Sequence, residues 1–393
     1  MRQKVLLRWQ ANNLFGWGLL GLNLFEQWAS DPDVEPLMGV RIESRDVQCI
    51  DPLRLSAIQT ATAASNDFLD ALKAGKTDLR NSATVVVDAF GNKLTPAADR
   101  VGTVGIRNVA RCIFEDTRLD SAQAVEHYDS LLCASEWNAG LLRAVSAKPV
   151  TMIHEGIDHS LFFPGPRSGL FDPGRFYVFT GGKIEYRKAQ DLVLFAFREF
   201  AARHSDAVLV AAWNSPWPQM SVGFQGNLLA PLHLDAKGAL DISRWTAENR
   251  IPPGQFINLP MTPNPLMPMV LREMDCAIQV SRCEACTNLP AKEAMACGVP
   301  VILANNTGTK ELVDSDNCLA LNSQDPVAGQ SGVGTNGWGE SRVEEIVAAL
   351  ETLYTDTQMR KRIAARGAEW ILERHRTWRD HANSLKNHLL TLG

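Results

Sequence analysis

A glycine-rich and basic segment near the middle of the chain has the composition of a phosphate-binding loop. It reads Gly181-Gly182-Lys183-Ile184-Glu185-Tyr186-Arg187-Lys188 and lies between an apolar run and a segment with helical spacing. Glycines let a backbone approach a ligand closely, and Lys183, Arg187 and Lys188 place cations beside it. Basic side chains at a helix start oppose the helix dipole, so they need an anion to compensate them. The segment therefore predicts a loop that binds a diphosphate.

A second segment carries carboxylates on either side of a helix start. After the apolar run that ends at Val280, the chain has a loop with Glu284, a short helix with Glu293 and a Gly-Val-Pro turn. These carboxylates can accept hydrogen bonds from sugar hydroxyls, while free amides at the helix start can bind an anion. Cys283 and Cys286 have the spacing of a metal or redox pair, but no second pair or nearby histidine completes a site. We therefore predict a sugar and phosphate site without a metal.

The N-terminal part has a glycine segment of its own. Gly16-Trp17-Gly18-Leu19-Leu20-Gly21 follows the first apolar run and fits the G-x-G-x-x-G pattern of nucleotide-binding turns. A dinucleotide site also needs an acidic residue at the end of the second strand. Here Asp31, Asp33 and Glu35 precede that strand, at residues 36–38, so a glycine-lined ligand cleft is favoured. A nicotinamide- or flavin-dependent oxidoreductase stays an alternative.

Short apolar runs alternate with segments of helical spacing along the chain. In the first half, strands are predicted at 5–7, 84–87, 109–114, 131–134 and 150–153, and helices at 19–29, 52–74 and 136–145. The rhythm restarts after Phe163-Pro164-Gly165-Pro166, with strands at 176–180, 207–213, 256–259, 276–280 and 301–304 and a helix from 188 to about 203. This alternation predicts an α/β protein with two facing, doubly wound Rossmann-like domains.

The predicted domains divide near residue 165. We predict an N-terminal domain over 1–164, a C-terminal domain over 165–372 and a C-terminal helix over 373–393 that packs back on the first domain. Residues 323–339 are glycine-rich and lack periodicity, so they predict a surface loop, whereas 341–392 contain no proline and predict helices.

The composition excludes several classes of protein. The 393 residues include 39 basic and 44 acidic side chains, for a formal net charge of −5, and no long run of one sign suggests a nucleic-acid partner. No stretch of about 18 apolar residues could span a membrane, and no cleavage site of a signal peptide follows the N-terminus. The eight scattered cysteines suit reduced, buried thiols. We expect a cytoplasmic protein, and peripheral contact with the inner membrane face stays open.

Several segments resemble the GT-B glycosyltransferases of the large retaining family four. They are 182–188, 284–300, Ser135-Glu136-Trp137-Asn138, Lys148-Pro149-Val150 and His154-Glu155-Gly156-Ile157-Asp158. The resemblance covers most of the chain from about Asn108 onward. It implies the GT-B fold, transfer of a sugar from a nucleotide-diphosphate sugar with retention of configuration, no metal requirement and no cofactor.

The family's site residues carry over to positions of this chain. The resemblance implies that Glu284 contacts the transferred sugar, that Glu293 holds the ribose hydroxyls, and that Lys183 and Lys188 hold the diphosphate. Eight residues separate the two glutamates where the family usually has seven, and Lys183 stands where it often has arginine. We predict as catalytic Lys183, Lys188 and Glu284. We predict as donor-binding Gly182, Arg187, Thr262, Ala285, Cys286, Thr287, Asn288, Leu289 and Glu293.

The acceptor is expected at the N-terminal domain, where residues that follow the strands face one edge of the sheet. The predicted acceptor-binding residues are Gly16, Gly18, Asn92, Glu115 and Asp116. Relatives commonly have a histidine in such a loop; no equivalent is evident, and His154 fits a hinge residue as well as a ligand. Two acidic pairs, Asp31 with Asp33 and Asp314 with Asp316, resemble the metal-binding pair of the other glycosyltransferase fold but are interpreted as solvated turns.

The sequence thus predicts a glycosyltransferase, with a hexosyl group transferred to a hydroxyl of a glycan, lipid-linked or protein-linked acceptor. A nucleotide-sugar epimerase of the same architecture, which would act without an acceptor, is one alternative. A non-catalytic sugar-binding module is another, although Lys188 and Glu293 count against it.

Overall fold

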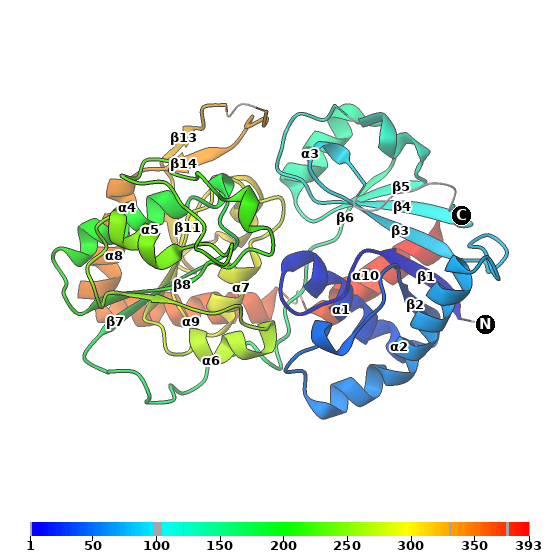
Figure 1. The fold of residues 1–393 in the computed structure, drawn as a ribbon, viewed down its shortest axis with the longest axis horizontal. Coiled ribbons are helices and arrows are strands. Elements are labelled where there is room, and N and C mark those ends of the chain that lie inside the picture. The colour runs from blue at the N-terminus through cyan, green and yellow to red at the C-terminus, as the bar shows by residue number, and fades with distance from the viewer. Residues whose placement is uncertain (1, 97–103, 121, 330–331, 375–376, 393) are drawn as a thin grey trace.

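Two domains lie side by side, each built on a six-stranded parallel sheet with helices on both faces (Figure 1). The computed structural model describes residues 2–96, 104–120, 122–329, 332–374 and 377–392. The predicted division near residue 165 falls in the connection between the last strand of one sheet and the first strand of the other. The predicted α/β class with two doubly wound domains is confirmed.

The N-terminal sheet has the strand order β2-β1-β3-β4-β5-β6, and all its neighbours pair in parallel. Its elements are β1 (Gln3–Arg8), α1 (Gly16–Ala29), β2 (Val34–Met38), α2 (Pro52–Lys73), β3 (Val85–Phe90), β4 (Arg107–Cys112), β5 (Ser130–Cys133), α3 (Glu136–Val145) and β6 (Val150–Met152). Along β1, Val5 and Leu7 pack on the α1 side, whereas Leu6 packs with Val86 on the other. The strand order reverses between β1 and β3, where open α/β sheets bind ligands.

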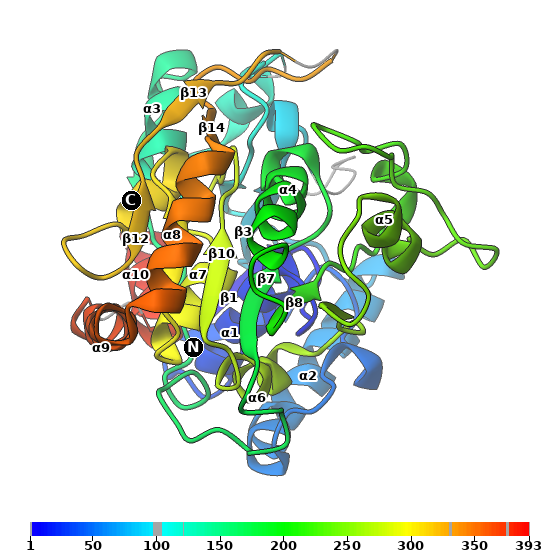
Figure 2. The same ribbon diagram turned by 90° about the vertical axis from the view of Figure 1, so that its left-hand side faces the viewer.

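The C-terminal sheet has the order β12-β11-β10-β7-β8-β9, so its reversal lies between β7 and β10. Its strands are β7 (Phe176–Gly181), β8 (Ala207–Ala212), β9 (Phe256–Asn258), β10 (Cys276–Gln279), β11 (Val301–Ala304) and β12 (Leu319–Leu321). Its helices are α4 (Gln190–Ala201), α5 (Ile242–Glu248), α6 (Met267–Leu271), α7 (Leu289–Ala296), α8 (Val343–Thr355) and α9 (Thr357–Glu373). The core on one face includes α4 and α8, and the core on the other includes α7 and α9 (Figure 2). Short 3-10 turns lie at 44–46, 92–94, 122–127, 186–188, 218–220, 264–266 and 307–312.

The last helix, α10 (Trp378–Thr391), returns to the N-terminal domain and packs against α1 (Figure 1). The Trp28 indole donates to the Ala382 carbonyl at 3.3 Å, and Trp378 and Leu385 join the apolar core over the first sheet. The chain therefore crosses between the domains twice, once before β7 and once before α10.

The predicted loop at 323–339 is wrong in part, because the segment includes a β-hairpin. β13 (Gln324–Pro326) pairs antiparallel with β14 (Gly339–Ser341), and both views place this hairpin beside α3. We call residues 324–341 the clasp hairpin; positions 330 and 331 lie outside the described residues. Its strands are short and lack alternating apolar side chains, so the sequence carries no strand signal. Contacts with a distant loop stabilise it instead.

Other boundaries shift for local reasons. The helix predicted from residue 188 begins at Gln190, because 186–188 form a 3-10 turn and Ala189 is left-handed with a φ of 57°. β12 was not predicted, since an edge strand of three residues is too short to show a period. The helix predicted at 136–145 coincides with α3, where the Ser135 hydroxyl caps the first turn.

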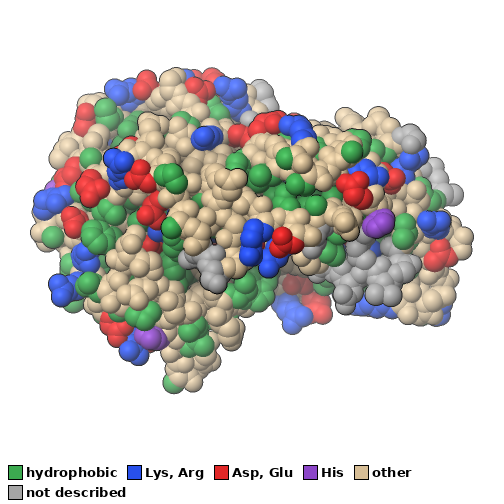
Figure 3. Space-filling model, turned by 90° about the horizontal axis from the view of Figure 1, so that it is seen from above, with side chains coloured by type: hydrophobic (Ala, Val, Ile, Leu, Met, Phe, Trp, Pro, Cys, Tyr) green, Lys and Arg blue, Asp and Glu red, His purple; other side chains and the backbone are tan. Residues whose placement is uncertain are grey.

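Charged side chains of both signs share one face of the molecule, and most of the thiols are buried. On the face that Figure 3 presents, Lys and Arg side chains are interspersed with Asp and Glu. Within the described residues, no helix is both long and apolar enough to cross a membrane. The eight cysteines are free thiols and most of them are buried.

Candidate active site

The predicted phosphate loop follows β7 at the carboxyl edge of the second sheet. Gly182 has a φ of +126°, which side chains rarely tolerate, so this turn requires glycine. The Gln190 side chain donates to the Lys183 carbonyl at 2.8 Å, which folds the loop back on the start of α4. A Cβ built on Gly182 would lie 3.5 Å from Cδ of Lys188. The loop therefore holds the stem of Lys188 directly beside the glycine turn.

The Glu284 carboxylate meets this loop from the end of β10. Oε1 accepts from Lys188 Nζ and from Ser281 Oγ, each at 2.6 Å, and Oε2 accepts from Arg187 Nη1 at 3.0 Å. Asn288 Nδ2 approaches Oε1 at 3.3 Å. Although burial acts to raise it, Lys188 and Arg187 hold the pKa of Glu284 below its usual value. Two predicted catalytic residues, Lys188 and Glu284, are thus brought into direct contact.

Arg187 lies among three carboxylates from three loops. Its Nε is 2.7 Å from Glu185, and its Nη1 is 3.0 Å from Glu284 and 3.3 Å from Glu115 of the N-terminal domain. These carboxylates raise the pKa of Arg187, although burial opposes them. Lys183 pairs with Glu185 at 2.8 Å, and its amine lies 5.0 Å from the ring centre of Trp217. We call Lys183, Arg187 and Lys188 with Glu115, Glu185 and Glu284 the charge cluster.

Glu293 lies on α7, apart from the charge cluster. Its Oε1 accepts from Asn264 Nδ2 at 2.6 Å, and burial raises its pKa to about 7. It lines a small cavity with Leu19 of α1 and Gly156 of the interdomain connection. The predicted ribose-binding carboxylate therefore faces the N-terminal domain across the cleft.

The loop between these glutamates consists largely of predicted donor-binding residues. The Asn288 side chain accepts from the Ala291 amide at 3.2 Å and so caps α7, whose next residue is Leu289. The Thr287 hydroxyl is buried and has no hydrogen-bond partner among the described residues. Ala285 uses its carbonyl to accept from Ser135 of the other domain at 2.6 Å, and burial raises the pKa of the Cys286 thiol. A hydroxyl at the start of a helix can donate a hydrogen bond to a bound anion.

The predicted acceptor-binding residues have separate positions at the edge of the first sheet. Gly16 begins α1 and is exposed, whereas a Cβ on Gly18 would lie 2.1 Å from the Asn12 side chain. Asn92 Oδ1 accepts from the amides of Glu115 and Asp116 at 2.7 and 3.1 Å. Only Glu115 of this set reaches the charge cluster, and the acceptor role of all five stays a prediction.

The clasp hairpin closes the cleft at this point. The Gly334 amide donates to Asp116 at 2.7 Å, and the Trp338 indole donates to the Glu115 carbonyl at 3.0 Å. Asp116 therefore joins the domains in this structure, and the loop that carries Glu115 is fixed from both sides.

Sequence reasoning missed several residues of the site. Asn264, which orients Glu293, also donates its amide to the Asn13 carbonyl across the cleft at 2.8 Å. Glu185 lies within the predicted phosphate loop, and Ser281 directly follows the predicted strand at 276–280, but neither had an assigned role. The signal available for each was a polar side chain near a predicted cation or carboxylate. Predicted donor residue Thr262 follows β9, and its hydroxyl donates to the Pro260 carbonyl at 2.8 Å.

The remaining polar motifs have structural partners. Asp31 pairs with Lys386 at 2.7 Å, and Asp314 accepts from the Trp370 indole at 3.0 Å. No group of three or more metal-ligating side chains occurs in the part of the chain that the structure describes. His154 lies 3.1 Å from Glu311, between the domains.

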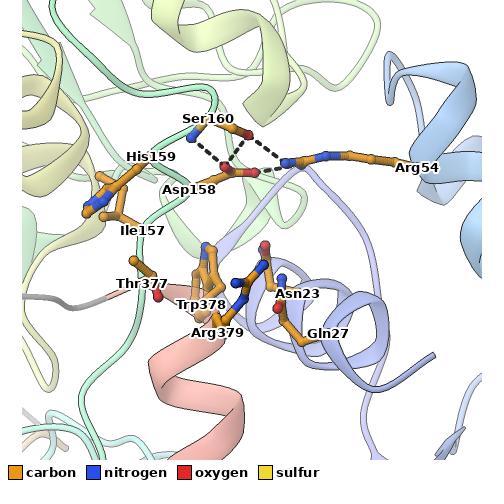
Figure 4. Close-up of a pocket in the computed structure, with 10 residues that line it drawn as sticks. All are labelled: Asn23, Gln27, Arg54, Ile157, Asp158, His159, Ser160, Thr377, Trp378 and Arg379. Atoms are coloured by element: carbon orange, nitrogen blue, oxygen red, sulfur yellow. Dashed lines mark hydrogen bonds and ion pairs between the residues drawn. The ribbon is translucent and has the colours of Figure 1, made fainter. Parts of the chain in front are cut away.

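A cavity of about 270 Å³ lies at the domain connection, away from the charge cluster. Figure 4 shows α1 and the start of α10 on one side of it and the connection at 157–160 on the other. Arg54 of α2 reaches the connection, where it lies 2.6 Å from Asp158 and 2.7 Å from Ser160. These contacts hold the connection against the N-terminal domain.

A sequence match supports the predicted class. Residues 268–385 match the family described as "Family 4 Glycosyltransferase in conflict systems". This range includes Glu284, the whole of α7 and the returning helix α10 up to residue 385. None of the curated proteins is significantly similar to the sequence.

Solved structures resemble the whole chain. Sucrose-phosphate synthase from Thermosynechococcus elongatus has a TM-score of 0.69 at 16% identity, covering 100% of this chain and 99% of that one. HepE from Anabaena, in complex with UDP and glucose, has a TM-score of 0.67 at 14% identity, with 99% and 100% covered. A glycosyltransferase from Rickettsia africae has a TM-score of 0.63 at 9% identity, with 100% and 98% covered. At these identities the likeness establishes the fold.

The chain therefore has the fold of GT-B glycosyltransferases, and its residues 268–385 resemble a family-four glycosyltransferase. The family match within the C-terminal half and the GT-B architecture of the whole chain confirm the predicted resemblance to family four, also termed group 1, and the prediction of a glycosyltransferase.

Proposed function

We propose that this enzyme transfers a hexosyl group from a nucleoside diphosphate sugar to a hydroxyl of a glycan, lipid-linked or protein-linked acceptor, with retention of configuration and without a metal ion. One observation carries the proposal: Lys188 and Arg187 converge on Glu284 where the strand order of the second sheet reverses. The similar structure of HepE is a complex with UDP and glucose, which supports a nucleotide-sugar donor.

The chemistry follows from the charges of the site. Cleavage of the bond between sugar and diphosphate leaves negative charge on the departing phosphate, and positive charge develops at the anomeric carbon. Lys183 and Lys188 would stabilise the phosphate charge, in a site that is already organised before reaction. Because lysine and arginine supply this positive charge, the proposal needs no metal.

The two glutamates have different parts in this proposal. Glu284, held ionised by its neighbours, would accept a hydrogen bond from the transferred sugar and lie near the developing positive charge. Glu293 would accept hydrogen bonds from the ribose hydroxyls, for which Asn264 orients it. The cleft edge of the N-terminal domain would supply the acceptor and exclude water.

Calorimetry and product analysis test the proposal. We expect at least one of UDP, GDP and ADP to bind, and the matching α-linked glucose donor to release α-glucose first when followed by proton NMR. EDTA should leave that rate unchanged. Binding of none of the three diphosphates would contradict the donor class, release of the β-anomer first would contradict retention, and inhibition by EDTA would contradict metal independence.

The same experiment separates the epimerase alternative. An epimerase converts the donor into a second nucleotide sugar without an acceptor, and this product is distinct in the NMR spectrum. Its appearance would replace the transferase proposal.

A further inference from the structure

The charge cluster contains as many carboxylates as cations. Lys183, Arg187 and Lys188 each lie within 3.3 Å of a carboxylate oxygen of Glu115, Glu185 or Glu284. A diphosphate carries several negative charges, so any diphosphate that binds these cations must share them with the protein's own carboxylates. The role of one of these carboxylates in that competition rests on the proposed function, in which a nucleoside diphosphate occupies the loop.

Two of the three carboxylates contact other cations of the cluster rather than Lys183. Glu284 is 7% exposed and accepts from Lys188, Arg187 and Ser281, so it is fixed in place. Glu115 belongs to the other domain, and among the described residues its carboxylate forms an ion pair with Arg187 alone, at 3.3 Å. Neither touches Lys183 in the described contacts.

Glu185 differs from both because it belongs to the phosphate loop itself. One oxygen is 2.8 Å from Lys183 and the other is 2.7 Å from Arg187, so a single carboxylate bridges two cations. Its side chain is 28% exposed, the most of the three, and so has solvent on one side. Although burial acts to raise it, Arg187 and Lys183 lower the pKa of Glu185 to about 2, so it stays charged at neutral pH.

The position of Lys183 reflects this contact. Its amine lies between the Glu185 carboxylate and the half-exposed ring of Trp217, which comes from the connection after β8. Lysine side chains lose much conformational freedom when held in one place. Glu185 therefore both orients Lys183 and reduces the positive charge that it presents.

We propose that Glu185 is a positioning residue that acts as an internal counter-anion of the diphosphate site: it bridges Lys183 and Arg187, competes with the diphosphate for them, and so weakens binding of the nucleoside diphosphate product. Without Glu185, Lys183 would lose its described carboxylate contact and Arg187 one of three, so the product would bind more tightly and leave more slowly. The donor sugar is subject to the same competition at its diphosphate.

The test compares Glu185→Gln with the wild-type enzyme by calorimetry, using UDP, GDP and ADP as probes. Loss of one unit charge beside two cations should strengthen binding of the diphosphate that binds best by about tenfold. In steady state the variant should show a lower KM for the donor together with a lower kcat, because release becomes slower. Glu185→Asp, which keeps the charge, should restore wild-type affinity.

A matched control removes a carboxylate elsewhere in the same domain. Glu248 pairs with Arg244 on the exposed surface of α5 at 2.7 Å, and Glu248→Gln should leave diphosphate affinity unchanged. Thermal unfolding shows whether each variant is folded. Stronger binding by Glu185→Gln alone supports the proposal.

Failure of this proposal and of the proposed function give different results. Equal or weaker binding by Glu185→Gln, with the wild type binding normally, overturns the counter-anion role and leaves the donor class intact. If neither protein binds any of the three diphosphates, the donor class itself is contradicted and the counter-anion role with it.

Discussion

The carboxyl edges of the two sheets, which face each other across the cleft, differ in the kinds of contact that their side chains make. At the C-terminal domain, charged side chains from the loops after β7 and β10 contact one another directly, with Lys188 and Glu284 at 2.6 Å. At the N-terminal domain, the predicted residues mainly brace the backbone, as Asn92 does for the amides of Glu115 and Asp116. Glu115 is the predicted acceptor residue that crosses to the charge cluster.

This difference follows from what each edge is proposed to bind. A diphosphate is the same in every nucleotide sugar, and its charge demands fixed cations, which a short loop can carry in consecutive residues. An acceptor hydroxyl is neutral, so the opposite edge needs shape and a few hydrogen bonds. Local sequence therefore describes the first edge well, whereas long-range contacts shape the second.

Removal of a cation from the C-terminal edge should reduce activity more than any other change. Lys188→Ala should lower the rate of sugar transfer by about 10²-fold or more, the loss seen when one organised donor to a developing anion is removed. Lys93→Ala removes an exposed lysine that follows β3 at the opposite edge and should change the rate less than about twofold. Initial rates with saturating acceptor measure both. Similar losses of rate in the two variants would contradict the proposal that cations at the C-terminal edge stabilise the departing phosphate.

Each domain contains a largely buried glutamate whose titration should make the stability of the protein depend on pH. Burial raises the pKa of both Glu26 on α1 and Glu293 on α7 from 4.5 to about 7. Each is therefore protonated in the folded protein at a pH where the unfolded chain is ionised. Its stabilising contribution is complete below about pH 4.5 and is lost as pH rises through about 7, by at most about 3 kcal/mol.

Neutral replacements test this pair. The melting temperatures of Glu26→Gln and Glu293→Gln, each compared with that of the wild type at the same pH, should increase between pH 5 and pH 8. Only Glu293→Gln should weaken binding of the nucleoside diphosphate, because only Glu293 lies at the proposed ribose site. Unchanged nucleotide affinity in Glu293→Gln would remove that assignment.

Neighbouring glycines at the N-terminal edge have unequal constraints. A Cβ on Gly18 would lie 2.1 Å from the buried Asn12 side chain, whereas a Cβ on Gly16 would have no heavy atom within 4 Å. Gly18→Ala should therefore destabilise the protein by about 1–3 kcal/mol, as overpacking does, and Gly16→Ala should be close to neutral. Thermal unfolding of the two variants measures the difference, and equal stabilities would contradict the close contact.

A change in the clasp hairpin should have a weaker effect than the others. Trp338→Phe removes an indole donor to the Glu115 carbonyl, a loss of about 0.5–1.5 kcal/mol that favours separation of the domains. Trp370→Phe removes a similar indole bond, to Asp314, within the C-terminal domain. X-ray scattering should show a larger radius of gyration for Trp338→Phe only. An equal increase in both variants would mean that the clasp does not hold the domains together.

Much of the fold and part of the site could be predicted from the sequence. Parallel strands covered on both faces appear in the sequence as apolar runs. The cations of the phosphate loop are close together in the sequence, so both signals can be recognised within short stretches. The clasp hairpin was not predicted because its strands have no apolar face. The role of Asn264 was not predicted because its partners Glu293 and Asn13 are distant in the chain.

The two sheets, their approximate strand positions and the kinds of charge available to the cleft could all be predicted from the order of the residues. Apolar periodicity and local side-chain chemistry act over a few residues, and they are legible in one dimension. Which carboxylate meets which cation depends on the folded arrangement of the chain. Arg187, Glu284 and Glu115 belong to three separate segments and meet only because the carboxyl edges of the two sheets face each other. Charge interactions decrease with distance, so the balance of the cluster exists only in that arrangement.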